Sequence, residues 1–110
     1  MLYNPKVVKF SHPVSFTDGT PFGVADYAGT EFAVAVDGGS PVPTVAIPVA
    51  FGDGTGSVPL ADLDLPQRKT LLLYARTVAA NGTVSDWSAP SAPFMFDLRK
   101  PAPPLALVVS

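Results

Sequence analysis

The stretch TLLLYARTVAANGTVSDWSAPSAPF, residues Thr70–Phe94, decides the fold that we expect for this chain. Its first half is rich in leucine, valine, threonine and tyrosine, a composition that favours β-strands. Asn81-Gly82 follows, and this pair is typical of a tight type I′ hairpin because both residues accept positive φ angles. We therefore predict a longest strand over Thr70–Ala80 and a return strand that starts at Thr83–Trp87, pauses at the repeated Ser-Ala-Pro and finishes as Ala92–Leu98.

Composition excludes several other kinds of protein. The chain has 110 residues, which fits one domain, and it contains 13 prolines and no cysteine. Because proline breaks a helix interior, long helices are not expected. Without cysteine, the chain has no disulfide, no thiolate nucleophile and no cysteine-based metal site.

Further strands are predicted from alternating apolar and polar residues. Glu31–Asp37 alternates cleanly and predicts a half-buried strand with Phe32, Val34 and Val36 on its apolar face, ended by the turn Asp37-Gly38-Gly39-Ser40. Thr44–Phe51 alternates as well, and Pro48 predicts that this strand lies at a sheet edge or contains a bulge. The remaining predicted strands are one within Lys6–Phe16, one over Phe22–Tyr27 and a short one over Ser57–Leu60.

About seven short strands separated by turn residues indicate an all-β fold, a single antiparallel β-sandwich over residues 1–98. Gly52-Asp53-Gly54-Thr55-Gly56 is expected to be a flexible turn, and Leu63 and Leu65 are expected to tuck under the sandwich. Residues 99–110 form a separate, extended, proline-rich C-terminal tail.

The segment LYARTVAANGTVSDWSAPSAPFMF resembles the last two strands of a fibronectin type III-like domain, and LADLDLP resembles the connection before that hairpin. The resemblance covers Ser57–Leu98 and, more loosely, Glu31–Phe51. The family's core tryptophan is absent from the first half, so Phe22, Tyr27 or Phe32 would have to fill its volume. The resemblance implies adhesion, spacing or scaffolding, and domains of this kind occur in bacteriophage structural proteins and in bacterial secreted enzymes.

Two surfaces are candidate partner-binding sites. If the hairpin follows the family register, Leu71, Leu73, Ala75, Thr77 and Ala79 face the core and the alternate residues face outward. Trp87 then either seals the end of the core or lies near Arg76 in a docking patch. The residues of this predicted patch are Leu72, Tyr74, Arg76, Val78 and Trp87.

The tail is the second candidate surface. Arg99–Pro104 is a stiff spacer that delivers the uncharged run Leu105–Val109 away from its own domain. Such a run pairs readily with other strands, so it should be covered by a sheet edge of the same subunit or of a neighbour, of which we favour the neighbour. The predicted contact residues are Leu105, Leu107, Val108 and Val109.

No catalytic, cofactor or metal site is predicted. His12 is the only histidine and is expected at an edge or in solvent, and Asp53 stands almost alone as a cation ligand. The net charge of −2 offers no basic field for nucleic acid, and no apolar run has the length to span a membrane. The N-terminus lacks the pattern of a signal peptide, which predicts a location in a virion or otherwise in the cytoplasm.

The sequence thus predicts a non-enzymatic structural subunit of a larger assembly, an oligomer or part of a multi-subunit complex. Its expected partners are neighbouring copies or a capsid or tail protein of a bacteriophage, where it would act as a capsid decoration or tail accessory protein. The alternative is a carbohydrate- or receptor-binding adhesion module that uses Trp87 and Tyr74 as a stacking platform.

Overall fold

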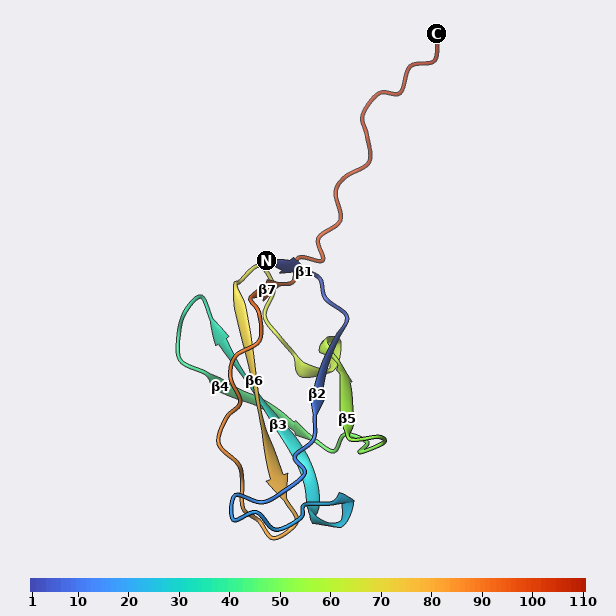
Figure 1. The fold of residues 1–110 in the computed structure, drawn as a ribbon. Helices are drawn as coiled ribbons and strands as arrows, with labels where there is room; N and C mark the ends of the chain where they lie inside the picture. The colour runs from blue at the N-terminus through green and yellow to red at the C-terminus, as the bar shows by residue number, and fades with distance from the viewer.

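The computed structural model describes all 110 residues and contains β-strands and two short 3-10 turns, without an α-helix (Figure 1). The strands are β1 (Leu2–Tyr3), β2 (Val7–Ser11), β3 (Tyr27–Val36), β4 (Val42–Ile47), β5 (Thr55–Pro59), β6 (Leu71–Ala79) and β7 (Phe94–Met95). The 3-10 turns are η1 (Val24–Asp26) and η2 (Leu60–Leu63). Neither 3-10 turn has the length and the hydropathy that a membrane-spanning helix requires.

The strands form two sheets. One has five strands in the order β1-β7-β6-β3-β4, and the other pairs β2 with β5. The prediction of an all-β fold is confirmed, but the prediction of a purely antiparallel one is wrong, because β1 runs parallel to β7. β1 was not predicted from the sequence, because a segment of 2 residues is too short to show any alternation.

β3 and β6 are the two central strands of the larger sheet, and they pair over their whole length. β3 has 10 residues and β6 has 9, so the predicted order of length is reversed. β3 is also not half-buried as predicted, because Ala33 and Ala35 are buried as well as Phe32 and Val34. The two alanines lie opposite Tyr74 and Leu72, whose larger side chains cover them on the second face of the sheet.

One core joins the two sheets. Phe32, Leu63 and Leu71 are fully buried, and Phe32 is the aromatic residue that takes the centre of the cluster. Leu65 is half-buried beside them, which confirms that the Leu63–Leu65 connection tucks under the strands. The other buried members come from both sheets, from η2 and from the loop after β4, to which Val49 belongs: Val34, Val49, Val58, Leu60, Leu73 and Phe94.

β4 behaves as its prolines predict. It is an edge strand of the larger sheet, its pairing with β3 shifts register between Glu31 and Ala33, and it ends at Ile47, directly before Pro48. The predicted edge position is therefore confirmed, but the predicted strand Thr44–Phe51 is too long at its C-terminal end, since Pro48 terminates the strand instead of lying within it. The strand predicted over Phe22–Tyr27 is wrong, since η1 occupies its centre and only Tyr27 enters a strand.

The hairpin turn after β6 differs from the predicted type. Gly82 has φ of +87°, but Asn81 does not have a positive φ, so the turn is not type I′. Gly82 N–H donates to Ala79 O at 3.0 Å and Ala79 N–H donates to Thr83 O at 2.8 Å. This pattern is a three-residue loop in which a type I turn precedes a left-handed glycine. An Asn-Gly pair serves either loop, so the dipeptide alone did not distinguish them.

The same local motif occurs three times. In Asp18-Gly19-Thr20, Asp53-Gly54-Thr55 and Asn81-Gly82-Thr83, the first side chain accepts hydrogen bonds from the N–H and hydroxyl of the threonine two residues later. Each glycine has a positive φ. Side chains of this type stabilise turns by such bonds, so the loop around Asp53 is a turn, as predicted, held by its own side-chain hydrogen bonds.

His12 is buried, which contradicts the prediction of a solvated or edge histidine. Its ring stacks on Phe51 at 4.3 Å between centroids and meets Phe10 and Tyr27 edge-on. Nε2 donates a hydrogen bond to Ala50 O at 3.2 Å. The histidine therefore packs as an aromatic residue in the region where the loop after β2 meets the loop after β4.

The C-terminal tail leaves the body at the β1–β7 end and extends away from it (Figure 1). Every residue from Leu98 to Ser110 is exposed. We call residues 100–110 the arm and the rest of the chain the body. The arm lengthens the molecule to 73 Å along its longest axis, against 30 and 19 Å along the others.

Candidate protein-protein interface

The two faces of β6 match the predicted hairpin register only in part, because Ala75 and Thr77, which were predicted to face the core, are half-buried like the outward residues. Leu71, Leu73 and Ala79 are buried on the inner face, while Leu72 and Tyr74 are only half-buried on the outer face. Arg76 and Val78 share that outer face and are also half-buried. The predicted patch therefore exists as a partly covered surface. Because its apolar members, Leu72, Tyr74, Val78 and Trp87, are half-buried, the patch exposes less apolar area than fully exposed side chains would.

Arg76 is the centre of this outer face. Its guanidinium Nη2 lies 2.6 Å from Glu31 Oε1, across the β3–β6 pair in which the two residues are direct partners. Trp87 covers the guanidinium, with Arg76 Cζ 4.4 Å from the ring centroid, a cation–π distance. Trp87 therefore lies over the sheet and does not seal the end of the core, and Arg76 occupies one face of its ring.

The return segment after the hairpin pairs with β6 in an unexpected manner. Only Val84 forms a β-bridge with β6, so the predicted strand over Thr83–Trp87 is absent. Instead, serines 85, 88 and 91 each donate their backbone N–H to a β6 carbonyl, of Thr77, Ala75 and Leu73 respectively. Each serine Oγ in turn accepts the N–H of that same β6 residue, at 2.9–3.0 Å.

A period of three explains this serine ladder. A polyproline II segment has 3 residues per turn, so every third side chain meets the same neighbour. The prolines at 90 and 93 favour that conformation and remove donors that an ordinary β-ladder would need. The spacing Ser-x-x-Ser-x-x-Ser was the available sequence signal. The repeated Ser-Ala-Pro is therefore not the predicted pause between strands, because Ser88 and Ser91 continue the contact with β6.

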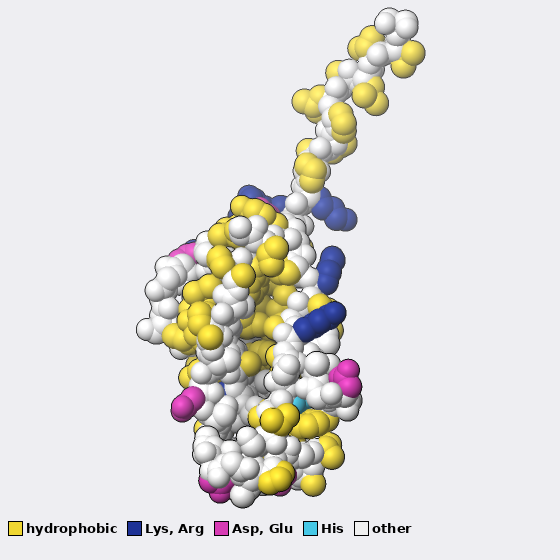
Figure 2. Space-filling model, viewed as in Figure 1, with side chains coloured by type: hydrophobic (Ala, Val, Ile, Leu, Met, Phe, Trp, Pro, Cys, Tyr) yellow, Lys and Arg dark blue, Asp and Glu magenta, His cyan; other side chains and the backbone are white.

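The arm presents the most exposed apolar side chains of the chain. Leu105, Leu107, Val108 and Val109 are 90%, 86%, 85% and 99% exposed. No side chain or backbone group from Pro101 to Ser110 forms a hydrogen bond with the body. Figure 2 shows these hydrophobic side chains standing clear of the body along the arm. The structure therefore does not bring the arm and the outer face of β6 together.

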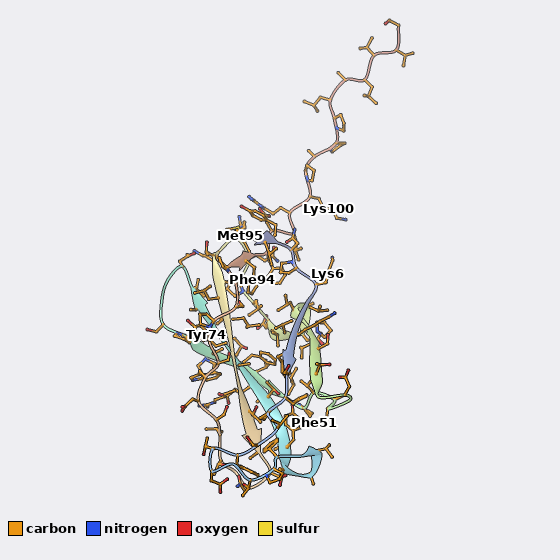
Figure 3. The ribbon with its side chains drawn as sticks, in the orientation of Figure 1. Lys6, Phe51, Tyr74, Phe94, Met95 and Lys100 are labelled. Carbon is orange, nitrogen blue, oxygen red and sulfur yellow. The ribbon has the colours of Figure 1, made fainter.

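The root of the arm is fixed to the body. Asn4 Nδ2 donates to Asp97 O at 3.1 Å, and Asp97 N–H donates to Asn4 Oδ1 at 2.8 Å. The Asp97 carboxylate accepts two hydrogen bonds from the Arg99 side chain and one from the Arg99 backbone N–H, which lower the pKa of Asp97 to about 2. Figure 3 shows Lys100 where the arm begins, near Met95 and Lys6. The arm thus starts from a defined position, while its apolar run stays free.

The side chains with possible catalytic or metal-binding chemistry are dispersed. No group of three or more His, Cys, Asp or Glu side chains is placed to hold a metal ion. The one hydrogen bond of the His12 side chain is to the Ala50 carbonyl. Asp62 and Asp64 are exposed on η2 and directly after it.

No family model, no curated protein and no solved structure matches the chain.

Proposed function

We propose that this protein is a non-enzymatic structural subunit of a larger assembly, built as a fibronectin type III-like β-sandwich that carries an adhesive arm. The observation that carries the proposal is the exposure of Leu105, Leu107, Val108 and Val109 on an arm that contacts nothing in its own chain. An uncharged apolar segment of this kind is unfavourable in water and is typical of a segment that a partner covers.

The strand order supports the sandwich. The order β7-β6-β3-β4 corresponds to the G-F-C-C′ sheet of immunoglobulin-like sandwiches, and β2-β5 corresponds to their B-E pair. Side chains of both sheets enter one core, as two facing layers require. A sandwich of this type is used by many unrelated proteins, so the function is argued from the surface and not from the fold.

The energy available from the arm supports its role as the main contact. Covering one leucine or valine side chain contributes about 1.5–3 kcal/mol, so four such residues could outweigh a substantial part of the cost of association. The half-buried residues Leu72, Tyr74 and Val78 add a second, smaller surface. Aromatic side chains with a neighbouring arginine, here Tyr74, Trp87 and Arg76, are typical of interface centres.

The assembly that we propose is a bacteriophage virion, with the protein as a capsid decoration or tail accessory subunit. The resemblance of Ser57–Leu98 to fibronectin type III-like domains supports this class of protein. Many copies on a symmetric particle would add avidity to a contact that is weak for one copy.

The test is incorporation into particles. Particles from the source of the sequence are purified on a density gradient, and the copy number of the chain per particle is measured by quantitative mass spectrometry. We expect a fixed copy number for the wild type and a loss of at least about tenfold for a chain truncated after Lys100. The truncated chain should keep its melting temperature because the arm contacts nothing in the body. Absence of the wild-type chain from the particles would overturn the proposal.

A further inference from the structure

β2 has an edge with free backbone donors. Lys6 O accepts from Leu60 N–H and His12 N–H donates to Gly54 O, at the two ends of the β2–β5 pair. Because hydrogen-bonded pairs alternate along an antiparallel ladder, Val8 and Phe10 also face β5 with their backbone groups. The N–H and C=O groups of Val7, Lys9 and Ser11 therefore point away from β5, and none of them has a hydrogen-bond partner elsewhere in the chain.

An apolar groove runs beside this edge, between β2 and the segment Ser88–Phe94. Two adjoining hollows of about 210 and 190 Å³ share Val8, Lys9, Leu73 and Ser91 in their walls. Figure 2 shows the hollow between the two halves of the body, with hydrophobic side chains at its base and basic side chains on its rim. The apolar residues that line it include Val8, Phe10, Phe32, Leu73 and Phe94.

The other sheet edges are protected against strand pairing. β4 contains Pro43 and is flanked by Pro41 and Pro48. On the outer edge of β5, Pro59 has no N–H and the N–H of Thr55 is bonded to Asp53 Oδ1. Proline on an edge strand is a common guard against pairing with other chains. β1 has only 2 residues, so β2 is the one edge with successive free donors.

The arm matches this edge in length and chemistry. Leu105–Val109 and Val7–Ser11 both span five residues. In an extended conformation, Leu105, Leu107 and Val109 share one face, which can lie on the apolar floor of the groove. Ala106 has a φ of +50° in the free arm, which is unfavourable for an alanine, and pairing would return it to an extended φ.

We propose that Leu105–Val109 of a second copy of this chain adds as a strand along the free edge of β2, over the groove between β2 and Ser88–Phe94. Backbone hydrogen bonds to Val7, Lys9 and Ser11 would supply the pairing, and the leucine side chains would supply the apolar contact. The second copy is favoured over the chain's own arm because Pro101, Pro103 and Pro104 stiffen the spacer and carry the run away from its own body. This inference rests on the proposed function and identifies a second copy of the chain as one partner in the assembly.

The experiment measures self-association of the full chain by sedimentation equilibrium, from about 1 μM to about 1 mM, a range that covers weak docking contacts. We expect the wild type to associate. Leu107→Asp should weaken association at least about tenfold because a charge would enter the apolar groove. Ala102→Asp, which adds the same charge to the spacer, should associate as the wild type does.

The acceptor edge is tested with a second pair of variants. Lys9→Pro removes one outward N–H and should abolish association, while Lys9→Ala keeps that N–H and should not. A mixture of Leu107→Asp and Lys9→Pro chains should form heterodimers, because the first retains the acceptor edge and the second retains a working arm. This recovery also shows that both variants are folded.

Amide hydrogen exchange supplies an independent readout. The amides of Val7, Lys9 and Ser11 should be protected in the associated wild type and should exchange at least about tenfold faster in Leu107→Asp. A wild type that stays monomeric at all concentrations would overturn the inference, as would two monomeric variants whose mixture does not associate. A monomeric chain that is still incorporated into particles would overturn this inference and leave the proposed function standing. A chain that associates with itself but is absent from particles would overturn the proposed function and leave this inference standing.

Discussion

β6 and the arm both carry uncharged apolar runs, yet the chain buries one and exposes the other. In β6, Leu71 and Leu73 are 0% and 4% exposed. In the arm, Leu107 and Val109 are 86% and 99% exposed. The two runs differ in what flanks them. β6 has β3 on one side and the serine ladder on the other, whereas Pro101–Pro104 separates the arm from every strand of its own body.

Hydrophobicity alone therefore does not decide which segment enters the core. A segment becomes buried when neighbouring strands can satisfy its backbone groups at the same time as they cover its side chains. β6 meets both conditions within one chain. The arm meets neither condition within its own chain, and in our proposal the free edge of β2 on another copy supplies both.

The sharpest test of this difference compares one side chain from each region. Phe32→Ala should lower the free energy of unfolding by about 3–5 kcal/mol, because it opens a cavity at the centre of the core. Leu107→Ala should change the stability of the monomer by less than about 0.5 kcal/mol. Urea denaturation at low protein concentration measures both values. A loss of more than about 1 kcal/mol for Leu107→Ala would show that the arm packs on its own body.

A smaller effect tests how tightly the body is packed beside β2. An added Cβ at Gly56 would lie 2.6 Å from Phe10 Cζ and 3.0 Å from Val49 Cγ1. Gly56→Ala should therefore lower the free energy of unfolding by about 1–3 kcal/mol through overpacking. Gly23→Ala is the control, because Gly23 has a φ of −125° and open space around its Cα. Equal melting temperatures for the two variants would contradict the tight contact with Phe10.

The serine ladder predicts a loss of about 1 kcal/mol for each hydroxyl removed. Ser88→Ala deletes the acceptor of the Ala75 N–H, which lies 3.0 Å from Ser88 Oγ. Ser57→Ala is the matched control, because that exposed serine on β5 forms no side-chain hydrogen bond. Thermal denaturation compares the two variants. Should Ser57→Ala cost as much as Ser88→Ala, the ladder would not be a stabilising feature of the β6 edge.

The body was largely predictable from the sequence because its strands alternate with a period of two. The strand at Leu71–Ala79, the edge position of β4 and the burial of Leu63 follow from that alternation and from proline chemistry. The burial of Ala33 and Ala35 was missed, because it depends on the residues of β6 that lie opposite them. These are Tyr74 and Leu72, and the sequence of β3 alone does not identify them. His12 was misplaced for a related reason, since its position depends on the aromatic rings of Tyr27 and Phe51 from other segments, as well as on nearby Phe10.

The candidate interface was only partly predictable. The exposure of the arm follows from the stiff spacer, and the contact between Trp87 and Arg76 was one of two alternatives. The serine ladder and the free edge of β2 were not anticipated. The ladder has a period of three, and the edge depends on which strands pair, which no single segment specifies.

Asp97, at the boundary between body and arm, provides the last prediction. The hydrogen bonds from the Arg99 side chain are the largest cause that holds the pKa of this carboxyl at about 2, below the ordinary value of 3.8. Because the pKa is lower in the folded chain than in the unfolded one, ionised Asp97 favours the folded junction above about pH 4, and this contribution is lost as the pH falls toward 2.

The carboxyl carbon of Asp97, followed by NMR during an acid titration, should have its midpoint at about 2. In Arg99→Ala the midpoint should rise toward 3.8. Lys100→Ala should not move it, because Lys100 forms no bond to this carboxylate. A wild-type midpoint that Arg99→Ala leaves unchanged would mean that the Asp97–Arg99 pair does not persist in solution. The arm would then begin at Asp97 rather than after Arg99, and its longer free reach would weaken the case that the spacer keeps the apolar run from its own β2 edge.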